Sequence, residues 1–329
     1  MQMQVKANAN IQNQSKKDSS LNKRTANNLS KLIYEQRYLF LMSMPFVIWV
    51  LVFRYLPLWG WTMAFQNYKP AKGFFEQDWV GLKYFIELFQ DKTFYLALRN
   101  TLAMSMLQIT FGFVIPIIFA LLLNEVKNGM FKKIVQTVSY LPHFVSWVIA
   151  ASLITTMLSV DTSGVINQLL LRLHIIEKPI NFLAIPKAFW WIVLFSDLWK
   201  EVGWNSIIYL AAITGIDMEL YDAAKVDGAG RFKQIWHVTL PGIRSTIIVL
   251  LIMNIGWLIN IGFEKQYLLG NSIVLEYSNV LDYYALTYGI QLGRYSYGTA
   301  VGIFKSVVSI ILVLAANKFA KVIGEGEII

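Results

Sequence analysis

The sequence MELYDAAKVDGAGRFKQIWHVTLP, which runs from Met218 to Pro241, carries the strongest pattern in this chain of 329 residues. Its first part, Glu219–Val226, is predicted to form a short helix, because an acidic residue near the start suits the helix dipole. Gly228 and Gly230 follow, and glycine commonly ends a helix or takes a positive φ. The segment is therefore too regular in its pattern to be a plain linker.

A second short helix is predicted over Arg231–Val238. Phe232, Ile235 and Trp236 recur at the spacing that forms one apolar helix face, and Pro241 is suited to begin the next helix. Two short helices with apolar faces need a surface that covers them. That surface is either the membrane interface and the rest of this subunit, or a cytoplasmic partner; the residues alone leave both alternatives open.

The composition around this segment is that of a membrane protein. Hydrophobic residues make up 56% of the chain and charged residues 15%, whereas an ordinary soluble domain has about 25% charged residues. The net charge of +9 fits the positive-inside bias of membrane proteins better than nucleic-acid binding. The chain has no cysteine, which excludes disulfides and cysteine metal sites.

Six apolar stretches are long enough to cross a bilayer, which takes about 20 residues. They are 38–56, 101–126, 135–158, 189–213, 246–263 and 297–317. The distribution of Lys and Arg predicts that both termini are cytoplasmic, which makes 214–245 an inner loop. We expect residues 1–37 to be a largely disordered cytoplasmic tail without a signal peptide. Residues 38–329 then form an all-α membrane domain of six transmembrane helices.

The inner loop resembles the EAA loop of ABC importer permeases. Its matching parts are Asp222-Ala223-Ala224, Asp227-Gly228-Ala229 and Val238-Thr239-Leu240-Pro241. The resemblance implies the type I importer permease fold, in which this loop is a coupling helix that sits in a groove of the ATPase subunit. The coupling residues that it implies are Asp222, Ala223, Ala224, Asp227, Gly228, Ala229, Phe232, Ile235, Leu240 and Pro241. The chain departs from the family in having Asp222 for a leading Glu and Ser245 where Pro is frequent.

Other segments are similar to the polysaccharide and oligosaccharide branch of these permeases, which is related to the maltose permeases. They are Trp79–Leu82, Asn100–Leu102, Tyr140–Trp147, Trp199–Ser206 and Tyr295–Gly302. This resemblance implies ATP-driven import of an oligosaccharide or polysaccharide fragment across the cell (inner, cytoplasmic) membrane. The implied partners are a second permease with a different sequence, an ATPase dimer, and an extracellular or periplasmic solute-binding protein.

The chain itself is not expected to be an enzyme. The Walker A pattern GxxxxGK[ST] does not occur in it, so ATP and Mg would be bound by the partner ATPase and this chain would carry no cofactor. His143, His174 and His237 are scattered over different segments and indicate no metal site. An integral-membrane enzyme would need a catalytic cluster, and the sequence shows none.

Charged residues within the 189–213 span form the first candidate site. Asp197, Lys200 and Glu201 share one helix face, and Lys200 is expected to pair with Asp197, which offsets part of the cost of burying both charges. These residues either lock the helix to a neighbour or form a polar wall of the translocation path. A rival hypothesis, an ion-coupled secondary transporter, would use the same three residues as its relay.

The second candidate site lies in the 246–263 span, where Asn254, Trp257, Ile261 and Glu264 share one predicted helix face. A sugar is bound by hydrogen-bonding groups together with an aromatic plane, although helix packing explains the same residues. The candidate substrate path as a whole is Trp199, Lys200, Glu201, Trp204, Asn205, Asn254 and Trp257. Lys305, within the last span, has no evident partner.

Overall fold

The computed structural model describes residues 35–322 of the chain. It divides into two compact units, one that reaches Thr62 and one that begins at Met63. Nearly all of the tail predicted at residues 1–37 lies outside the described residues.

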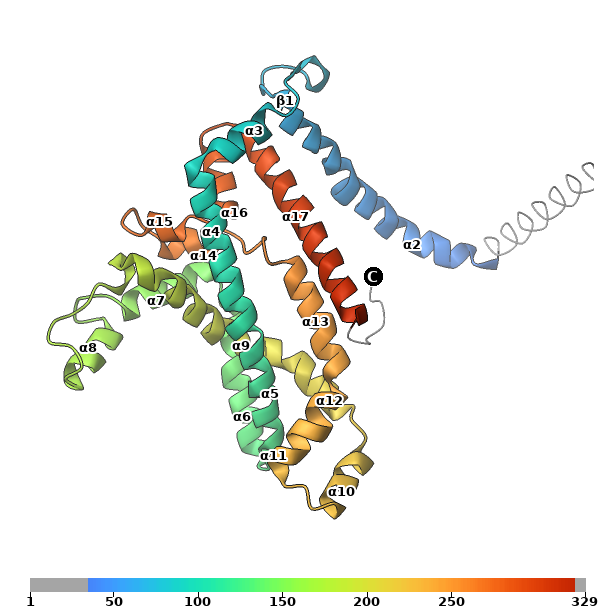
Figure 1. The fold of residues 1–329 in the computed structure, drawn as a ribbon, viewed down its shortest axis with the longest axis vertical. Coiled ribbons are helices and arrows are strands. Elements are labelled where there is room, and N and C mark those ends of the chain that lie inside the picture. Colours follow the sequence, from blue (N-terminus) through green and yellow to red (C-terminus); the bar gives the residue numbers. More distant parts are fainter. Residues whose placement is uncertain (1–34, 323–329) are drawn as a thin grey trace, which may run out of the picture. The chain divides into compact units, whose positions relative to one another are not determined.

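The described residues are almost entirely helical (Figure 1). The α-helices are α2 Arg37–Val50, α3 Lys83–Gln90, α4 Lys92–Leu107, α5 Val114–Glu125, α6 Gly129–Tyr140, α7 Trp147–Met157, α8 Val165–Arg172, α9 Phe189–Thr214, α10 Met218–Val226, α11 Arg231–Gln234, α12 Leu240–Gly242, α13 Arg244–Gly256, α14 Glu264–Leu269, α15 Leu275–Ser278, α16 Leu281–Ala285 and α17 Tyr295–Val322. Two very short strands, β1 Gln66–Asn67 and β2 Asp78–Trp79, pair antiparallel with Gln66 opposite Trp79. 

Wider and tighter helical turns join several of these helices. Segments of π-helix occupy Leu51–Tyr55, Gln108–Gly112, Ile235–Thr239 and Leu286–Gln291. Segments of 3₁₀-helix occupy Leu56–Phe65, Phe74–Glu76, Leu141–Phe144, Phe182–Ala184 and Pro186–Ala188. A π turn holds one more residue than an α-helix needs for the same turn and often marks a functional region.

Three continuous helical segments among the described residues are long and apolar enough to span a membrane: Arg37–Phe65, Lys92–Glu125 and Tyr295–Lys321. Two bent helix pairs would raise the number to five. α9 has 26 residues and nearly the predicted bounds, but Asp197, Lys200 and Glu201 in its middle make it less apolar than these spans.

The prediction of one straight helix over 135–158 is wrong. The chain forms Gly129–Phe144 and Trp147–Met157 instead, and the two pieces meet at an angle of 105°. Pro142 lacks an amide hydrogen to continue the α-helix, and Val145 and Ser146 are extended. The Ser146 hydroxyl then accepts a hydrogen bond from the Ile149 amide and caps α7. The apolar run is continuous across this break, so hydrophobicity alone does not reveal it.

The prediction of a helix over 246–263 is also wrong at its C-terminal end. α13 ends at Gly256, and an irregular segment leads to α14. In that segment Gly262 has a φ of +77°, which an L-residue rarely adopts. The Gly262 amide donates to Asp282 at 2.9 Å, and the other Asp282 oxygen accepts from Lys305. Lys305, which has no evident partner in its own span, therefore pairs with Asp282 of α16.

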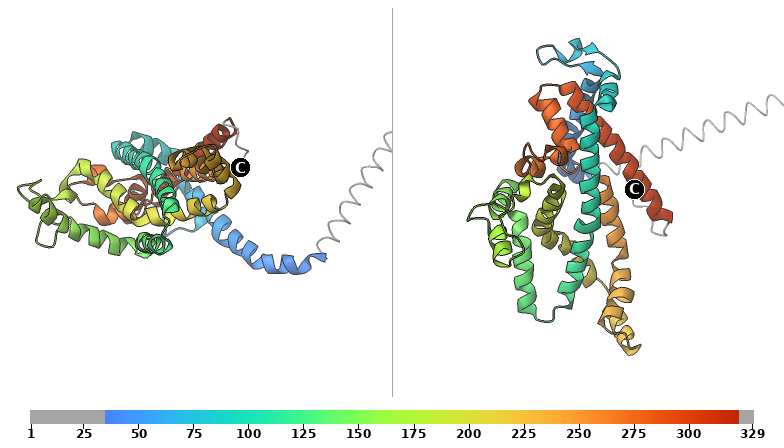
Figure 2. Two further views of the ribbon diagram at one scale, coloured as in Figure 1. Left: turned by 90° about the horizontal axis from the view of Figure 1, so that it is seen from below. Right: turned by 60° about the vertical axis from the view of Figure 1, so that its left-hand side comes forward.

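Figures 1 and 2 show that α3 and β1 lie at one end of the second unit and α10 and α11 at the opposite end. One buried cluster, which includes Phe94, Tyr284 and Tyr297, supports the end near α3. Another joins α5, α9 and α13 through residues such as Ile117 and Tyr209, nearer to α10. A third buried cluster, which includes Met104, Val193 and Leu269, packs α4, α9 and α14 together.

Candidate functional site

The segment that resembles a coupling loop forms two short helices joined by a tight turn, as predicted. Asp217 caps α10 by accepting a hydrogen bond from the Glu219 amide at 3.0 Å. Gly228 then takes a φ of +75°, and the Ala229 amide returns to the Ala224 carbonyl at 2.8 Å. This is the reversal that glycine permits after a helix. α11, the π turn Ile235–Thr239 and α12 continue the chain towards α13.

Part-buried hydrogen bonds join the two halves of this loop, and one close contact ties it to the end of α9. The Tyr221 and Thr239 hydroxyls are 3.0 Å apart, and the Gln234 side-chain amide donates to the Ala229 carbonyl at 2.7 Å. A Cβ atom on Gly242 would come within 2.7 Å of the Ile216 side chain, so α12 packs closely on the end of α9. The loop is therefore a fixed surface.

Large apolar side chains on this surface are uncovered. Val226 is 88% exposed, Phe232 79% and Trp236 62%, whereas Ile235 is half-buried. Of the other residues in the implied coupling set, Asp222, Ala223, Asp227, Gly228 and Pro241 are exposed, and Ala224, Ala229 and Leu240 are half-buried. Asp222 pairs with Lys225 at 2.8 Å in an exposed position. Exposed apolar patches of this kind mark interaction sites.

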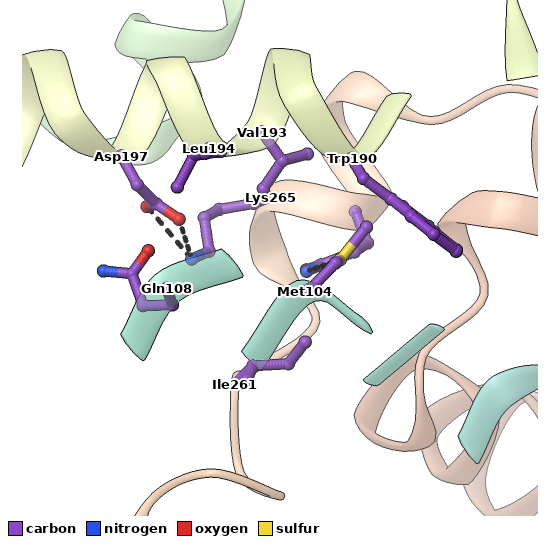
Figure 3. A pocket seen from close by; sticks show the side chains of 9 residues that line it. Met104, Gln108, Trp190, Val193, Leu194, Asp197, Ile261 and Lys265 are labelled. Atoms are coloured by element: carbon purple, nitrogen blue, oxygen red, sulfur yellow. Dashed lines mark hydrogen bonds and ion pairs between the residues drawn. The ribbon is translucent and has the colours of Figure 1, made fainter. Parts of the chain in front are cut away.

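A second set of candidate residues surrounds the middle of α9. Asp197, which is buried, pairs with Lys265 of α14 through oxygens at 2.7 and 3.0 Å, and Figure 3 shows the two side chains facing each other. The predicted pairing of Asp197 with Lys200 is therefore wrong. α14 follows the irregular segment after α13, and that fold-back brings a lysine to Asp197 that a straight helix would have placed elsewhere.

Lys200 and Glu201 instead bind the bend between α6 and α7. The Lys200 ammonium donates to the His143 carbonyl at 2.6 Å and lies 3.2 Å from Glu201. The Glu201 carboxylate is 2.7 Å from His143 Nδ1. The Trp204 ring stacks on the His143 ring, with centroids 4.2 Å apart. One turn of α9 thus anchors the broken span.

Trp147, at the start of α7, joins the two charge pairs. The Lys200 and Lys265 ammonium groups lie 5.7 and 5.5 Å from its ring centre, within the range of cation–π attraction. We call Asp197, Lys200, Glu201, Lys265 and His143 the α9 charge network. Two lysines and two carboxylates balance within it, so it needs no external ion for neutrality.

One cavity adjoins the network, and a second cavity shares Gln108 with it. The smaller one, about 30 Å³, is lined by Gln108, Asp197, Lys265 and Gln266 among others (Figure 3). Gln266 is 1% exposed, and its Oε1 has no hydrogen-bond partner among residues 35–322. A cavity of this volume is large enough for one water molecule. The larger one, about 90 Å³, brings Gln108 together with Asn205 and Asn254. Three side-chain amides from three segments thus line one polar space.

The structure separates the other predicted path residues. Trp199 lines an apolar cavity with Leu153 and Phe195. Trp257 follows the end of α13 and is 69% exposed. The predicted helix face that joins Asn254, Trp257, Ile261 and Glu264 is therefore wrong, because the helix stops at Gly256.

Sequence reasoning missed Gln108, His143 and Lys265. Gln108 is a polar residue inside an apolar span, which is a usable signal. His143 follows Pro142, so the proline break pointed to it. Lys265 is three residues after Gly262, and nothing local indicates that the chain folds back there.

Comparisons with known proteins identify the family of this chain. The model of the family described as binding-protein-dependent transport system inner membrane component matches residues 112–324. The polygalacturonan/rhamnogalacturonan transport system permease protein YteP of Bacillus subtilis (strain 168) is 50% identical over 297 residues, which cover 90% of this chain and 91% of that protein.

Solved structures are similar over nearly the whole chain. A chain of a bacterial ABC transporter involved in the import of the acidic polysaccharide alginate is 41% identical, with a TM-score of 0.83, and the match covers 91% of this chain and all of that one. A chain of a bacterial alginate ABC transporter in complex with alginate pentasaccharide-bound periplasmic protein is 40% identical, with a TM-score of 0.82; the match covers 90% of this chain and 98% of that one.

Proposed function

Because this chain belongs to the binding-protein-dependent transport system inner membrane component family, we propose that it is the permease subunit of an ATP-driven importer for an anionic oligosaccharide or polysaccharide fragment. The observation that carries the substrate class is the similarity over most of the chain to permeases whose names specify polygalacturonan, rhamnogalacturonan and alginate. Polymers of this class are rich in uronic acids, so the cargo would carry carboxylates and hydroxyls.

The proposed membrane arrangement has six spans and cytoplasmic termini. α9 serves as the sixth span beside the three continuous segments and the two bent pairs, because its charges are paired within the network and need no water. The Lys and Arg distribution supports an inner position for residues 214–245. In this arrangement residues 1–37 form the cytoplasmic tail and residues 38–329 the permease domain.

The proposed motor is a separate ATPase dimer that binds ATP and Mg. It would cover the uncovered side chains of the coupling loop, foremost Val226, Phe232 and Trp236. Closure of the dimer would move this rigid loop and, through α12 and the end of α9, the bundle. A second permease of different sequence would complete the path, and a solute-binding protein would deliver the sugar at the opposite end.

The proposed path passes the amides of Gln108, Asn205 and Asn254, because amide groups both donate to and accept from sugar hydroxyls. Lys200 and Glu201 would be less available to the sugar, because their side chains already bind His143 at the bend between α6 and α7. Trp204 contributes its ring face beside them. Trp199 and Trp257 lie outside this amide-lined space and would contact the second permease instead.

The first test is affinity purification of the tagged chain from its membranes in mild detergent. We expect an ATPase with a Walker A motif and a second permease to co-purify in stoichiometric amounts, because both contacts bury apolar surface. We also expect uptake of trigalacturonate to stop on ATP depletion and to survive an ionophore. Recovery of this chain alone, with uptake that an ionophore abolishes, would favour the ion-coupled transporter.

Gly228→Asp offers a second test. An L-residue at φ +75° is strained by about 1 kcal/mol or more, so the loop is expected to change shape and uptake to be lost while the protein stays in the membrane. Gly230→Asp is the matched control, since Gly230 has an ordinary φ of −68° and free space around it. Equal uptake by the two variants would contradict this role of the turn.

A further inference from the structure

A separate pocket of about 290 Å³ lies at the end of the second unit that is opposite to α10. Its walls come from β1 and the residue after it, from α3, and from the turn that begins α17. Six side chains give it its character: Tyr68, Lys83, Tyr84, Glu87, Arg294 and Tyr295. Its volume is close to the lower end of the range for small-molecule sites.

Some groups in this pocket are already satisfied by the protein. Glu87 pairs with Arg294, and the Tyr84 hydroxyl donates to Asn67 at 2.9 Å. Within residues 35–322, however, the Lys83 ammonium and the hydroxyls of Tyr68 and Tyr295 have no hydrogen-bond partner. The Lys83 ammonium lies 5.8 Å from the centre of the Tyr84 ring. The pocket therefore presents one cation and two hydroxyls that are available to a ligand.

The charge and the rings of the pocket select the ligand class. Two cations, Lys83 and Arg294, and one carboxylate, Glu87, line the pocket, which leaves an excess of one positive charge. The rings of Tyr68 and Tyr295 meet edge to face, 6.1 Å apart. Aromatic rings accept the C–H face of a sugar, and an ammonium group binds a carboxylate through charge-assisted hydrogen bonds.

We propose that this pocket binds a uronate unit of an oligosaccharide at the outer mouth of the permease, with its carboxylate on Lys83 and its ring against Tyr68 and Tyr295. The inference rests on the proposed function, which supplies the anionic cargo and the outward orientation of this end. It adds a site that is separate from the amide-lined cavity beside α9.

The wall behind the pocket is preorganised. The Arg294 guanidinium lies 4.4 Å from the Tyr297 ring centre, and the Tyr297 and Tyr284 hydroxyls are 2.6 Å apart. Tyr284 donates in turn to Asp91, which caps α4. Burial, with the hydrogen bonds to Asp91 and Tyr297, raises the pKa of Tyr284, so it stays protonated and keeps donating. A fixed wall loses little conformational entropy of its own when a ligand binds.

The test measures the affinity of trigalacturonate for the assembled transporter without its binding protein, by calorimetry. Lys83→Glu is expected to weaken binding about tenfold, since attraction becomes repulsion. Tyr295→Phe removes one hydroxyl and should weaken it about threefold. The control is Lys69→Glu, which makes the same charge change at the same end of the unit, outside the pocket. Neutral maltotriose should bind weakly and equally to all four proteins.

Equal weakening by Lys83→Glu and Lys69→Glu would overturn the proposal, because it would indicate diffuse attraction. Unchanged affinity of the Lys83→Glu variant for trigalacturonate would overturn it as well. The same holds if that variant loses only the docking of the binding protein. Trigalacturonate uptake by the unaltered transporter distinguishes failure of the proposed function from failure of the proposed pocket. Absence of that uptake contradicts the proposed function, whereas uptake without any effect of Lys83→Glu on affinity contradicts the pocket alone.

Discussion

Asp197→Leu is expected to lower the free energy of unfolding by about 3–5 kcal/mol, because it leaves the Lys265 ammonium without its counter-charge in a mostly buried position. The double variant Asp197→Leu, Lys265→Met removes both charges and should recover most of that loss. Thermal unfolding of the purified transporter in detergent measures both effects as shifts of the midpoint.

The exposed pair of Asp222 and Lys225 provides the matched control. Its oxygen and nitrogen are 2.8 Å apart, close to the 2.7 Å of the Asp197–Lys265 pair, but the side chains are 70% and 57% exposed. Asp222→Leu should therefore cost at most about 1 kcal/mol. Equal destabilisation by Asp197→Leu and Asp222→Leu would contradict the prediction that burial makes the loss of the Asp197 charge costly. Uptake that persists in the double variant would also exclude Asp197 as an ion-coupling relay.

Phe232→Asp is expected to weaken the contact with the ATPase at least about thirtyfold, the usual effect of losing a central aromatic anchor from an interface. The Phe232 ring is uncovered in this chain, so the substitution leaves no cavity and should not impair folding. The measurements are co-purification of the ATPase and ATP-dependent uptake, both of which should fall together.

Phe75→Asp is the control for this second variant. Phe75 is 86% exposed and lies in the segment between β1 and β2, far from α11 in the same unit. Its substitution should leave the ATPase bound. If Phe232→Asp still co-purifies the ATPase in full amount, α11 is not part of the contact surface, and the exposed face must serve the membrane interface instead.

The sequence was sufficient where the determining interactions are local. α10 was predictable because Glu219 and the glycine turn at Gly228 fix its two ends within one short segment. α9 was predictable because no proline interrupts its long and largely apolar sequence. The π turns and the 105° break before α7 are different, since the same apolar composition fits a straight helix and a broken one.

The partners of the buried charges were not predictable for a related reason. Lys265 reaches Asp197 from 68 positions along the chain, by way of the reversal at Gly262. Spacing along α9 suggested Lys200, the nearest cation, as the partner of Asp197. Such spacing does not show that a later segment of the chain folds back against α9. Lys305 and Asp282 repeat this pattern. Gln108 and the two asparagines meet only because three separate helices converge.

The π turn Gln108–Gly112 forms one wall of the amide-lined cavity. Gln108 and Gly112 both line that cavity, and the Gln108 amide packs so closely on Gly112 that a Cβ atom there would come within 2.3 Å of it. If the surplus residue of this turn passed along the helix, one half of the Lys92–Glu125 span would rotate against the other by about 100° and shift by about 1.5 Å. Such a shift would withdraw the Gln108 amide from the polar space without unfolding the helix, and the π turn would then act as a hinge at that depth.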